Sequence, residues 1–222
     1  MEEDDLASTL KESVSEVAGM LERIGAWGPY FRVSTGPVDD TWRPTSDLRD
    51  PAVRDALVAT TAARMGTDEM RVAASTFFFG YVARLWSVAV GSVVDSGRCV
   101  RLGPEQLLWR DDAGLQLHIV DPEFGGEAAV EVLDVQVEPL VDAWSGVVAS
   151  GLLWGNTVSA LVGTAQMIGS DARPHVDALL SDPRLADALD PTTGRRRSCC
   201  LYYRTLTGGL CGDCFFLAPP TS

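Results

Sequence analysis

Residues 72–94 read VAASTFFFGYVARLWSVAVGSVV and form the most apolar stretch of the 222-residue chain. A helix of this length could cross a lipid bilayer. Arg84 lies near its middle, however, and a charged residue at the centre of a bilayer is costly. We therefore interpret the stretch as the buried core helix of a globular protein, and we predict no transmembrane span.

Helical patterns continue on both sides of this core helix. Residues 3–25 place Leu and Val at helical spacing, which predicts an N-terminal helix. A second helix is expected to end near Met65 and to be capped by Ser46 and Asp47, because short polar side chains cap helix N-termini. Thr67 then supplies a cap for the core helix. The first part of the chain is thus expected to be largely helical.

The middle of the chain departs from this pattern. Residues 26–46 contain three prolines and two glycines, which indicates an ordered loop. Residues 107–110 and 115–120 are short apolar runs separated by a turn, which predicts a β-hairpin. Residues 128–167 return to helical spacing, with an interruption near Ser150. We therefore predict an α+β fold that is mostly helical and has a small antiparallel sheet.

The last part of the chain combines a short helix with the cysteines. Asp182 followed by Pro183 predicts a helix start, because proline is favoured at the first helical position, and this helix is expected to end near Leu189. We expect residues 1–194 to form a mainly helical scaffold that also binds the substrate. Residues 195–222 are expected to form a cysteine-bearing segment that is integrated with the scaffold in one domain.

Charge and the first residues limit the classes of function. The net charge is −13, which argues against a general role on nucleic acid, because phosphate backbones are bound by basic surfaces. The N-terminal residues are acidic, whereas a secretory signal begins with basic residues and an apolar run. We therefore expect a cytoplasmic protein, in which thiols stay reduced.

Four of the five cysteines lie within CCLYYRTLTGGLCGDC, residues 199–214, with the spacing C-C-x10-C-x2-C. In a reducing compartment such crowding indicates metal binding or redox chemistry rather than disulfides. Four thiolates can hold a [2Fe–2S] cluster, and nearby glycines let backbone N–H groups turn toward the sulfurs. Structural zinc is an alternative, although adjacent cysteines can hardly form the usual zinc knuckle. A third interpretation is a set of packed thiols without metal, the role that we expect for Cys99.

The cysteine segment resembles a known family. RRRSCCLYYR, residues 195–204, followed by CGDC, residues 211–214, is similar to the C-terminal signature of the FhuF-type ferric siderophore reductases. LLWGN, residues 152–156, resembles a second feature of that family, whereas the first two thirds of the chain show no residue-by-residue match. Phe215 departs from the proline that follows the last cysteine in many members.

This resemblance implies a cofactor, an activity and partners. It implies that one [2Fe–2S] cluster is bound by Cys199, Cys200, Cys211 and Cys214. It further implies an oxidoreductase that reduces siderophore-bound Fe(III) to Fe(II) and so releases iron from the chelate. Hard oxygen donors hold Fe(II) far more weakly than Fe(III), so that one electron is sufficient. The electron would come from a donor protein such as a ferredoxin or a flavoprotein reductase.

Two other classes of function stay open. A non-catalytic [2Fe–2S] electron carrier would share the cluster but would lack a binding site for ferric chelates. A zinc-stabilised interaction module would be colourless and would hold one zinc per chain. A siderophore-binding relative that has lost turnover is a further alternative.

Several residues outside the cysteines are candidates for docking the substrate or the electron donor. Positive neighbours favour the reduced form of a cluster, and arginines could also receive an anionic chelate. A solvated basic loop and packing in the core are the alternative interpretations of these residues. The candidates are Arg195, Arg196, Arg197, Arg204, Trp154 and Asn156. His118 and His175 have no partner at metal-binding spacing, and we expect them to be structural.

Overall fold

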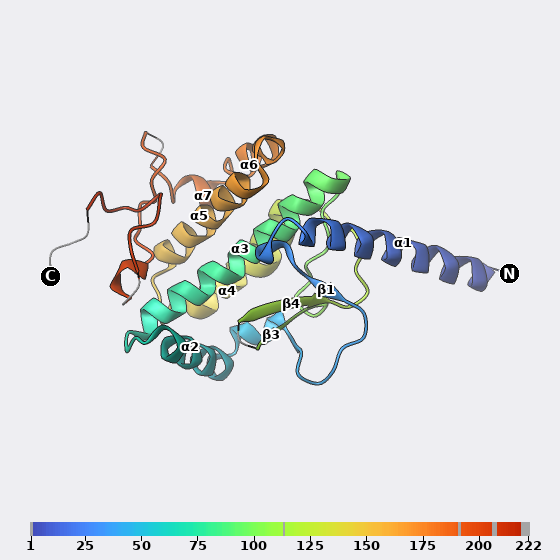
Figure 1. Ribbon diagram of the computed structural model, residues 1–222, viewed down its shortest axis with the longest axis horizontal. Coiled ribbons are helices and arrows are strands. Elements are labelled where there is room, and N and C mark those ends of the chain that lie inside the picture. Colours follow the sequence, from blue (N-terminus) through green and yellow to red (C-terminus); the bar gives the residue numbers. More distant parts are fainter. Residues whose placement is uncertain (1, 113, 191, 206–207, 219–222) are drawn as a thin grey trace. The chain divides into compact units, whose positions relative to one another are not determined.

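The computed structural model describes four ranges of the chain (Figure 1), namely residues 2–112, 114–190, 192–205 and 208–218. The chain divides into two compact units, each built from two separate segments. Residues 1–46 and 84–136 make up the first unit, and residues 47–83 and 137–222 make up the second. The cysteine-bearing segment, residues 195–222, therefore belongs to a unit that begins much earlier in the chain.

The apolar stretch forms the long helix α3, Met70–Ser96. By length and composition α3 could cross a membrane, and 72% of its most apolar window is buried inside the protein. Arg84 is half-buried, and its guanidinium lies over the ring of Tyr30, 4.9 Å from the centroid. This contact compensates in part for the burial that lowers the pKa of Arg84. Burial of α3 agrees with its interpretation as a core helix.

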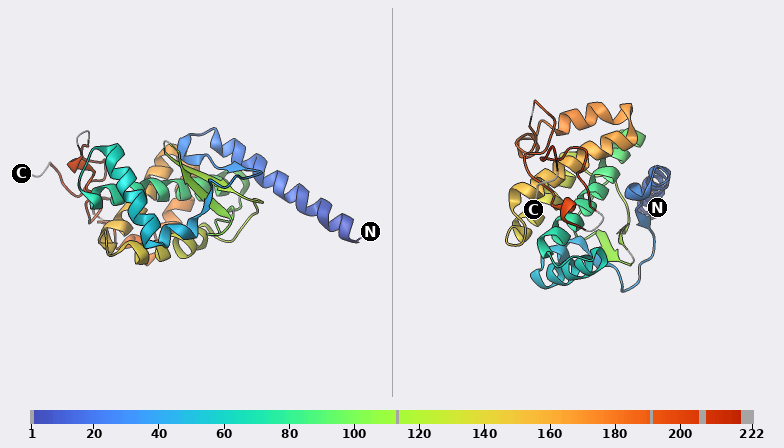
Figure 2. Two further views of the ribbon diagram at one scale, coloured as in Figure 1. Left: turned by 90° about the horizontal axis from the view of Figure 1, so that it is seen from below. Right: turned by 60° about the vertical axis from the view of Figure 1, so that its left-hand side comes forward.

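In the first unit, α1, Glu2–Gly25, confirms the predicted N-terminal helix. Its last turns bury Val17, Met20 and Ile24 completely. The N-terminal half of α1 extends away from the sheet of the same unit, as Figures 1 and 2 show. Among the side chains of α1 that the structure describes, these buried apolar residues anchor the helix in its unit.

The sheet confirms the predicted hairpin and adds two strands to it. β3, Leu107–Asp111, pairs antiparallel with β4, Leu115–Ile119. Two short strands, β1 at Ser34–Thr35 and β2 at Arg43–Pro44, lie in the segment that was predicted to be a loop. The order of the four strands in the sheet is β1-β4-β3-β2, and β1 runs parallel to β4. The parallel pairing of β1 was not predicted, because two-residue strands leave no alternation in the sequence.

The predicted helix over residues 128–167 is interrupted slightly earlier than expected. A π-helical segment, Val130–Val137 (η3), continues directly into α4, Glu138–Trp144. The break follows Trp144, and Ser150 already begins α5, Ser150–Ile168. Within η3, the buried carboxylate of Glu131 accepts the Leu102 N–H at 2.8 Å. The buried side chain thus satisfies a loop backbone group in the first unit.

In the second unit the caps differ from the prediction. Ser46 and Asp47 lie in a 3₁₀ turn, Thr45–Arg49 (η2), and they do not cap α2, Pro51–Met65. Asp50 is the N-cap, and its carboxylate accepts the N–H groups of Ala52 at 2.7 Å and Val53 at 3.2 Å. Pro51 occupies the first helical position, where its missing N–H costs nothing. The pattern of cap followed by proline was present but was assigned too early.

Replacing Asp50 by Ala is expected to lower the free energy of unfolding by about 1 kcal/mol, because two N–H groups at the start of α2 lose their acceptor. Urea denaturation of the protein measures this loss. Asp55→Ala is the control in the same helix, because Asp55 is exposed and pairs only at the surface with Arg54. Equal losses in the two variants would contradict the role of Asp50 as the cap.

The rest of the second unit packs around an aromatic centre. Trp144 is fully buried, stacks on Phe77 with ring centroids 5.8 Å apart, and donates its indole N–H to the Leu48 carbonyl at 2.8 Å. α5 and α6, Arg173–Leu179, lie next to each other (Figure 1). Asp182 caps α7, Pro183–Ala186, as predicted, although this helix ends before Leu189. The chain then enters the cysteine-bearing segment.

Candidate metal centre

Backbone hydrogen bonds fix the chain on its way to the first cysteines. The Arg197 N–H donates to the Ala188 carbonyl at 2.9 Å, just after α7. The Arg196 N–H donates to the Asp213 carbonyl at 3.1 Å. These two hydrogen bonds attach the segment before Cys199 to the residues that follow α7 and to the loop between Cys211 and Cys214.

Gly155 of the WGN sequence allows this segment to approach α5 closely. A Cβ added at Gly155 would lie 2.1 Å from the Ser198 hydroxyl oxygen. The same hydroxyl donates to the Gly151 carbonyl at 3.0 Å, at the start of α5. Ser198 is thus hydrogen-bonded to α5 at a place where any side chain at position 155 would collide with it.

Asn156 follows in the next position and joins three segments. Its side chain is completely buried, and its Nδ2 donates to both the carbonyl and the hydroxyl oxygen of Ser75 on α3, each at 3.0 Å. Its Oδ1 accepts a hydrogen bond of 3.0 Å from Arg196 Nη1. The Ser75 hydroxyl in turn donates to the Cys200 carbonyl at 2.7 Å. Asn156 therefore supports the cysteine segment from inside the unit.

Arg196 is the most deeply buried charge near the cysteines, with 1% of its side chain exposed. Its Nε lies 3.0 Å from the Asp213 carboxylate, and its Nη2 donates to Cys211 Sγ. Burial by itself lowers the pKa of Arg196, but the negative charges of Asp213 and the cysteines outweigh it, so the pKa is raised. The guanidinium therefore keeps its charge beside the sulfur atoms.

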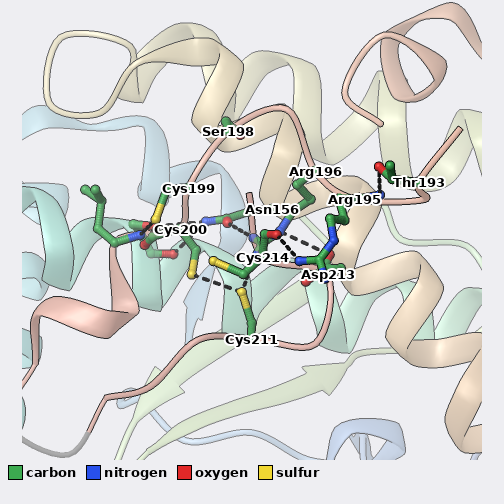
Figure 3. A network of polar contacts seen from close by, with 12 residues as sticks. Asn156, Thr193, Arg195, Arg196, Ser198, Cys199, Cys200, Cys211, Asp213 and Cys214 are labelled. Carbon is green, nitrogen blue, oxygen red and sulfur yellow. Dashed lines mark hydrogen bonds and ion pairs between the residues drawn. The ribbon is translucent and has the colours of Figure 1, made fainter. Parts of the chain in front are cut away.

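The sulfur atoms of Cys200, Cys211 and Cys214 gather on one side of this guanidinium (Figure 3). Cys200 Sγ and Cys211 Sγ are 3.8 Å apart, and Cys214 is buried. Cys199 Sγ lies apart from them and accepts the Leu201 N–H at 3.3 Å. Among the residues that the structure describes, no three His, Cys, Asp or Glu side chains are placed so that they could hold a metal ion together. Binding a metal through all four thiolates would therefore require the cysteine side chains to move closer together.

The surroundings of the cysteines shift the pKa values of their thiols in different directions. A hydrogen bond from Cys211, together with the Tyr202 backbone N–H and the positive charge of Arg196, lowers the pKa of Cys200 to about 5. Sharing that hydrogen bond raises the pKa of Cys211. Burial raises the pKa of Cys199. At neutral pH, the pair of Cys200 and Cys211 therefore carries one thiolate close to Arg196.

Leu201 holds an unusual backbone conformation directly after the adjacent cysteines. Its φ is 67°, in the left-handed region that non-glycine residues rarely adopt. This conformation costs about 1–2 kcal/mol for an L-residue. It turns the Leu201 N–H back toward Cys199 Sγ. Strain of this kind is frequent at functional sites, where the surrounding contacts maintain it.

The other arginines of the basic loop bind groups of the protein itself. Arg195 donates to the Cys214 carbonyl at 2.8 Å, and Arg197 donates through Nε to the Leu189 carbonyl at 2.9 Å. Arg204 forms an ion pair of 3.1 Å with Glu69. Each arginine therefore stabilises the loop, and a docking role for them stays a prediction.

Trp154 lies on α5 with its side chain half-buried, and the Arg184 guanidinium lies 6.0 Å from its ring centroid. Asn156, by contrast, has no exposed surface for a substrate to contact. Its position supports the interpretation as a hydrogen-bonded interior amide. Of the two candidates from the LLWGN sequence, only Trp154 reaches the surface.

Reasoning from the sequence missed three residues of this network. Asp213 carries a signal, since an acidic residue stands between two candidate ligands beside a run of arginines. Ser198 and Ser75 carry none, because their partners lie 47 and 125 residues away in the chain. The burial of Arg196 was also not foreseen, because its sequence neighbours are polar.

The fifth cysteine and His118 have structural roles, as expected. Cys99 is 4% exposed, and burial raises the pKa of its thiol to about 12. His118 lies on β4, where Nδ1 is 2.9 Å from the Ser34 hydroxyl and Nε2 is 3.0 Å from the Gly36 carbonyl. Both ring nitrogens thus have partners within the sheet.

No protein-family model matches the chain, and no curated protein sequence matches it. The resemblance to FhuF-type reductases therefore depends on the motif residues alone. Their chemistry is compatible with a thiolate-bound cofactor: four sulfurs lie within one short segment, and Arg196 and the Leu201 N–H both donate to sulfur. The set of thiols suits an iron–sulfur cluster better than zinc knuckles, because two of the four candidate ligands are adjacent.

Proposed function

We propose that this chain is a cytoplasmic ferric siderophore reductase that carries one [2Fe–2S] cluster. Its ligands would be Cys199, Cys200, Cys211 and Cys214. The observation that carries the proposal is the buried, charged Arg196 that donates to Cys211 Sγ within a segment holding four thiols. Positive charge fixed beside sulfur is expected at a redox centre that becomes more negative on reduction.

A bound cluster would supply one electron at a time, as reduction of one ferric ion requires. The chain itself has to hold the thiols and leave the centre accessible. Cys199, Cys200 and Cys211 are only partly buried, which supports a centre close to the surface. A bulky ferric chelate could then exchange an electron without entering an enclosed pocket.

The proposed reaction needs no general acid, base or nucleophile. The substrate is siderophore-bound Fe(III), and the product is Fe(II), which the oxygen donors of the chelate release. A ferredoxin or a flavoprotein reductase would then supply a new electron to the oxidised cluster. Half-buried Trp154 on α5, the helix that carries Asn156, is the residue that we propose for contact with the chelate.

Visible absorption and EPR spectra of the anaerobically purified protein test the cofactor. We expect charge-transfer bands that bleach with dithionite and a rhombic spin-one-half signal in the reduced protein. A colourless, EPR-silent protein with one zinc per chain would overturn the proposal and favour the interaction module. This outcome would leave the thiols with a structural role.

Mixing the reduced protein with a ferric siderophore then tests the activity. We expect the bands to return in a single turnover as Fe(II) appears in a chelator assay. Tryptophan fluorescence should be quenched on titration with the same ferric siderophore. A cluster that is reoxidised by a ferredoxin but not by ferric chelates would identify an electron carrier instead.

A further inference from the structure

Beyond the ligands themselves, we infer that Arg196 is a positioning residue that fixes Cys211 before the metal binds and raises the reduction potential of the centre. The second part of this inference rests on the proposed function, whereas the first part applies to any thiolate-bound metal. None of the other arginines near the cysteines donates to a sulfur atom in the described part of the chain.

The position of Arg196 is fixed on three sides. Asn156 accepts from Nη1 at 3.0 Å, the Asp213 carboxylate lies 3.0 Å from Nε, and Cys211 Sγ accepts from Nη2. The planar guanidinium presents Nη1 and Nη2 as donors in fixed directions, which a lysine ammonium cannot do, while the Asp213 contact is an ion pair. The Arg196 N–H also donates to the Asp213 carbonyl at 3.1 Å, so Arg196 contacts the loop of Cys211 through both its side chain and its backbone.

The support reaches both halves of the cysteine motif. Ser75 on α3 donates to the Cys200 carbonyl and accepts from Asn156 on α5, which in turn holds Arg196. The adjacent cysteines and the C-x2-C loop are therefore attached to one buried network that begins on two helices. A site supported from regular elements holds its ligands more accurately than one supported by loops.

The charge of Arg196 acts at short range and is buried. Only 1% of its side chain is exposed, so the solvent screens its field weakly. Arg197 has the same charge, but it is exposed and donates to a backbone carbonyl. Comparing these two neighbours separates a specific effect of Arg196 from the general effect of one charge less.

Redox titration followed by EPR is the first experiment, on cluster-loaded wild type, Arg196→Gln and Arg197→Gln. We expect Arg196→Gln to lower the equilibrium constant for reduction about tenfold, which is about 59 mV for a one-electron couple. Arg197→Gln should stay near the wild type. Equal potentials in Arg196→Gln and Arg197→Gln would overturn the redox part.

Asp213→Asn should shift the reduction potential in the opposite direction. It also keeps the inference testable if Arg196→Gln does not fold. Asp213 is partly exposed, so its replacement disturbs the fold less. Removing its negative charge leaves the charge of Arg196 uncompensated, and we expect the potential to rise. An unchanged or lower potential in Asp213→Asn would contradict the inference even if Arg196→Gln cannot be prepared.

Cobalt(II) binding to the apoprotein tests the positioning role without iron. Thiolate-to-cobalt charge-transfer bands, measured in competition with a chelator, give the affinity. We expect about a tenfold weaker affinity in Arg196→Gln, as for other groups that orient metal ligands, and wild-type affinity in Arg197→Gln. Equal affinities in wild type and Arg196→Gln would overturn the positioning role.

The two experiments also separate this inference from the proposed function. A wild-type protein that binds cobalt through thiolates but never assembles a cluster would remove the reductase, while the positioning role would still stand or fall on its own affinities. A wild-type protein that binds neither would overturn both proposals.

Discussion

Replacing Cys211 by Ser is expected to lower the iron and acid-labile sulfide content at least about tenfold and to abolish ferric siderophore reduction. Losses of about 10- to 100-fold already follow when groups that merely orient ligands are removed. Cys211 is both a candidate ligand and the sulfur that Arg196 holds, so the change removes a candidate thiolate and gives the guanidinium a neutral hydroxyl oxygen in place of the sulfur. Chemical analysis of iron and sulfide, together with the visible spectrum, measures the effect.

Cys99→Ala is the matched control for the cysteine variant. Cys99 is buried in the first unit, and its raised pKa keeps it a neutral thiol at neutral pH. The Cys99→Ala protein should therefore keep its full cluster content and its rate of reduction. Full activity of the Cys211→Ser protein would contradict the proposed ligand set, as would loss of the cluster on replacing Cys99.

Replacing Asn156 by Leu is expected to lower the free energy of unfolding by about 3 kcal/mol, because buried polar groups and a buried charge lose their partners. Leu has the same branched shape as Asn but no polar atoms. The variant leaves Arg196 Nη1 without its acceptor and the Ser75 carbonyl without the Asn156 donor. Urea denaturation of the apoprotein measures the loss without any contribution from a metal.

Thr61→Val serves as the control for this stability measurement. The Thr61 hydroxyl is also buried, but it donates to the Leu57 carbonyl of its own helix α2, which is a weak contribution. We expect a loss below about 1 kcal/mol from this change. An Asn156→Leu protein as stable as the wild type would show that the buried network contributes no net stability.

Local patterns in the sequence were sufficient for the main elements of the fold. α1 was predicted because apolar residues recur at helical spacing, α3 because of its long apolar stretch, and the hairpin of β3 and β4 because a turn separates two short apolar runs. The cap at Asp182 was found because its signal lies within two residues. At the start of α2 the same signal, Asp50 before Pro51, was overlooked in favour of Ser46 and Asp47.

Structural features that depend on partners far away in the chain could not be predicted from local sequence patterns. β1 pairs with β4 across more than eighty residues, and two residues carry no alternation to reveal such a strand. For the candidate site, spacing predicted the four cysteines as a group. The inward position of Arg196 depends on Asn156, which the LLWGN resemblance had singled out, and on Ser75, which has no mark in the sequence that distinguishes it from a surface residue.

The support of Arg196 by helices α3 and α5 limits how far the cysteine motif can be transplanted. A fusion that carries only residues 195–222 would bring all four thiols and the basic run, but it would leave Ser75 and Asn156 behind. A host protein would then have to bury an arginine beside a carboxylate without the amide that receives it here. Engineering a portable electron-transfer module from this chain would therefore have to start from the whole second unit, residues 47–83 and 137–222.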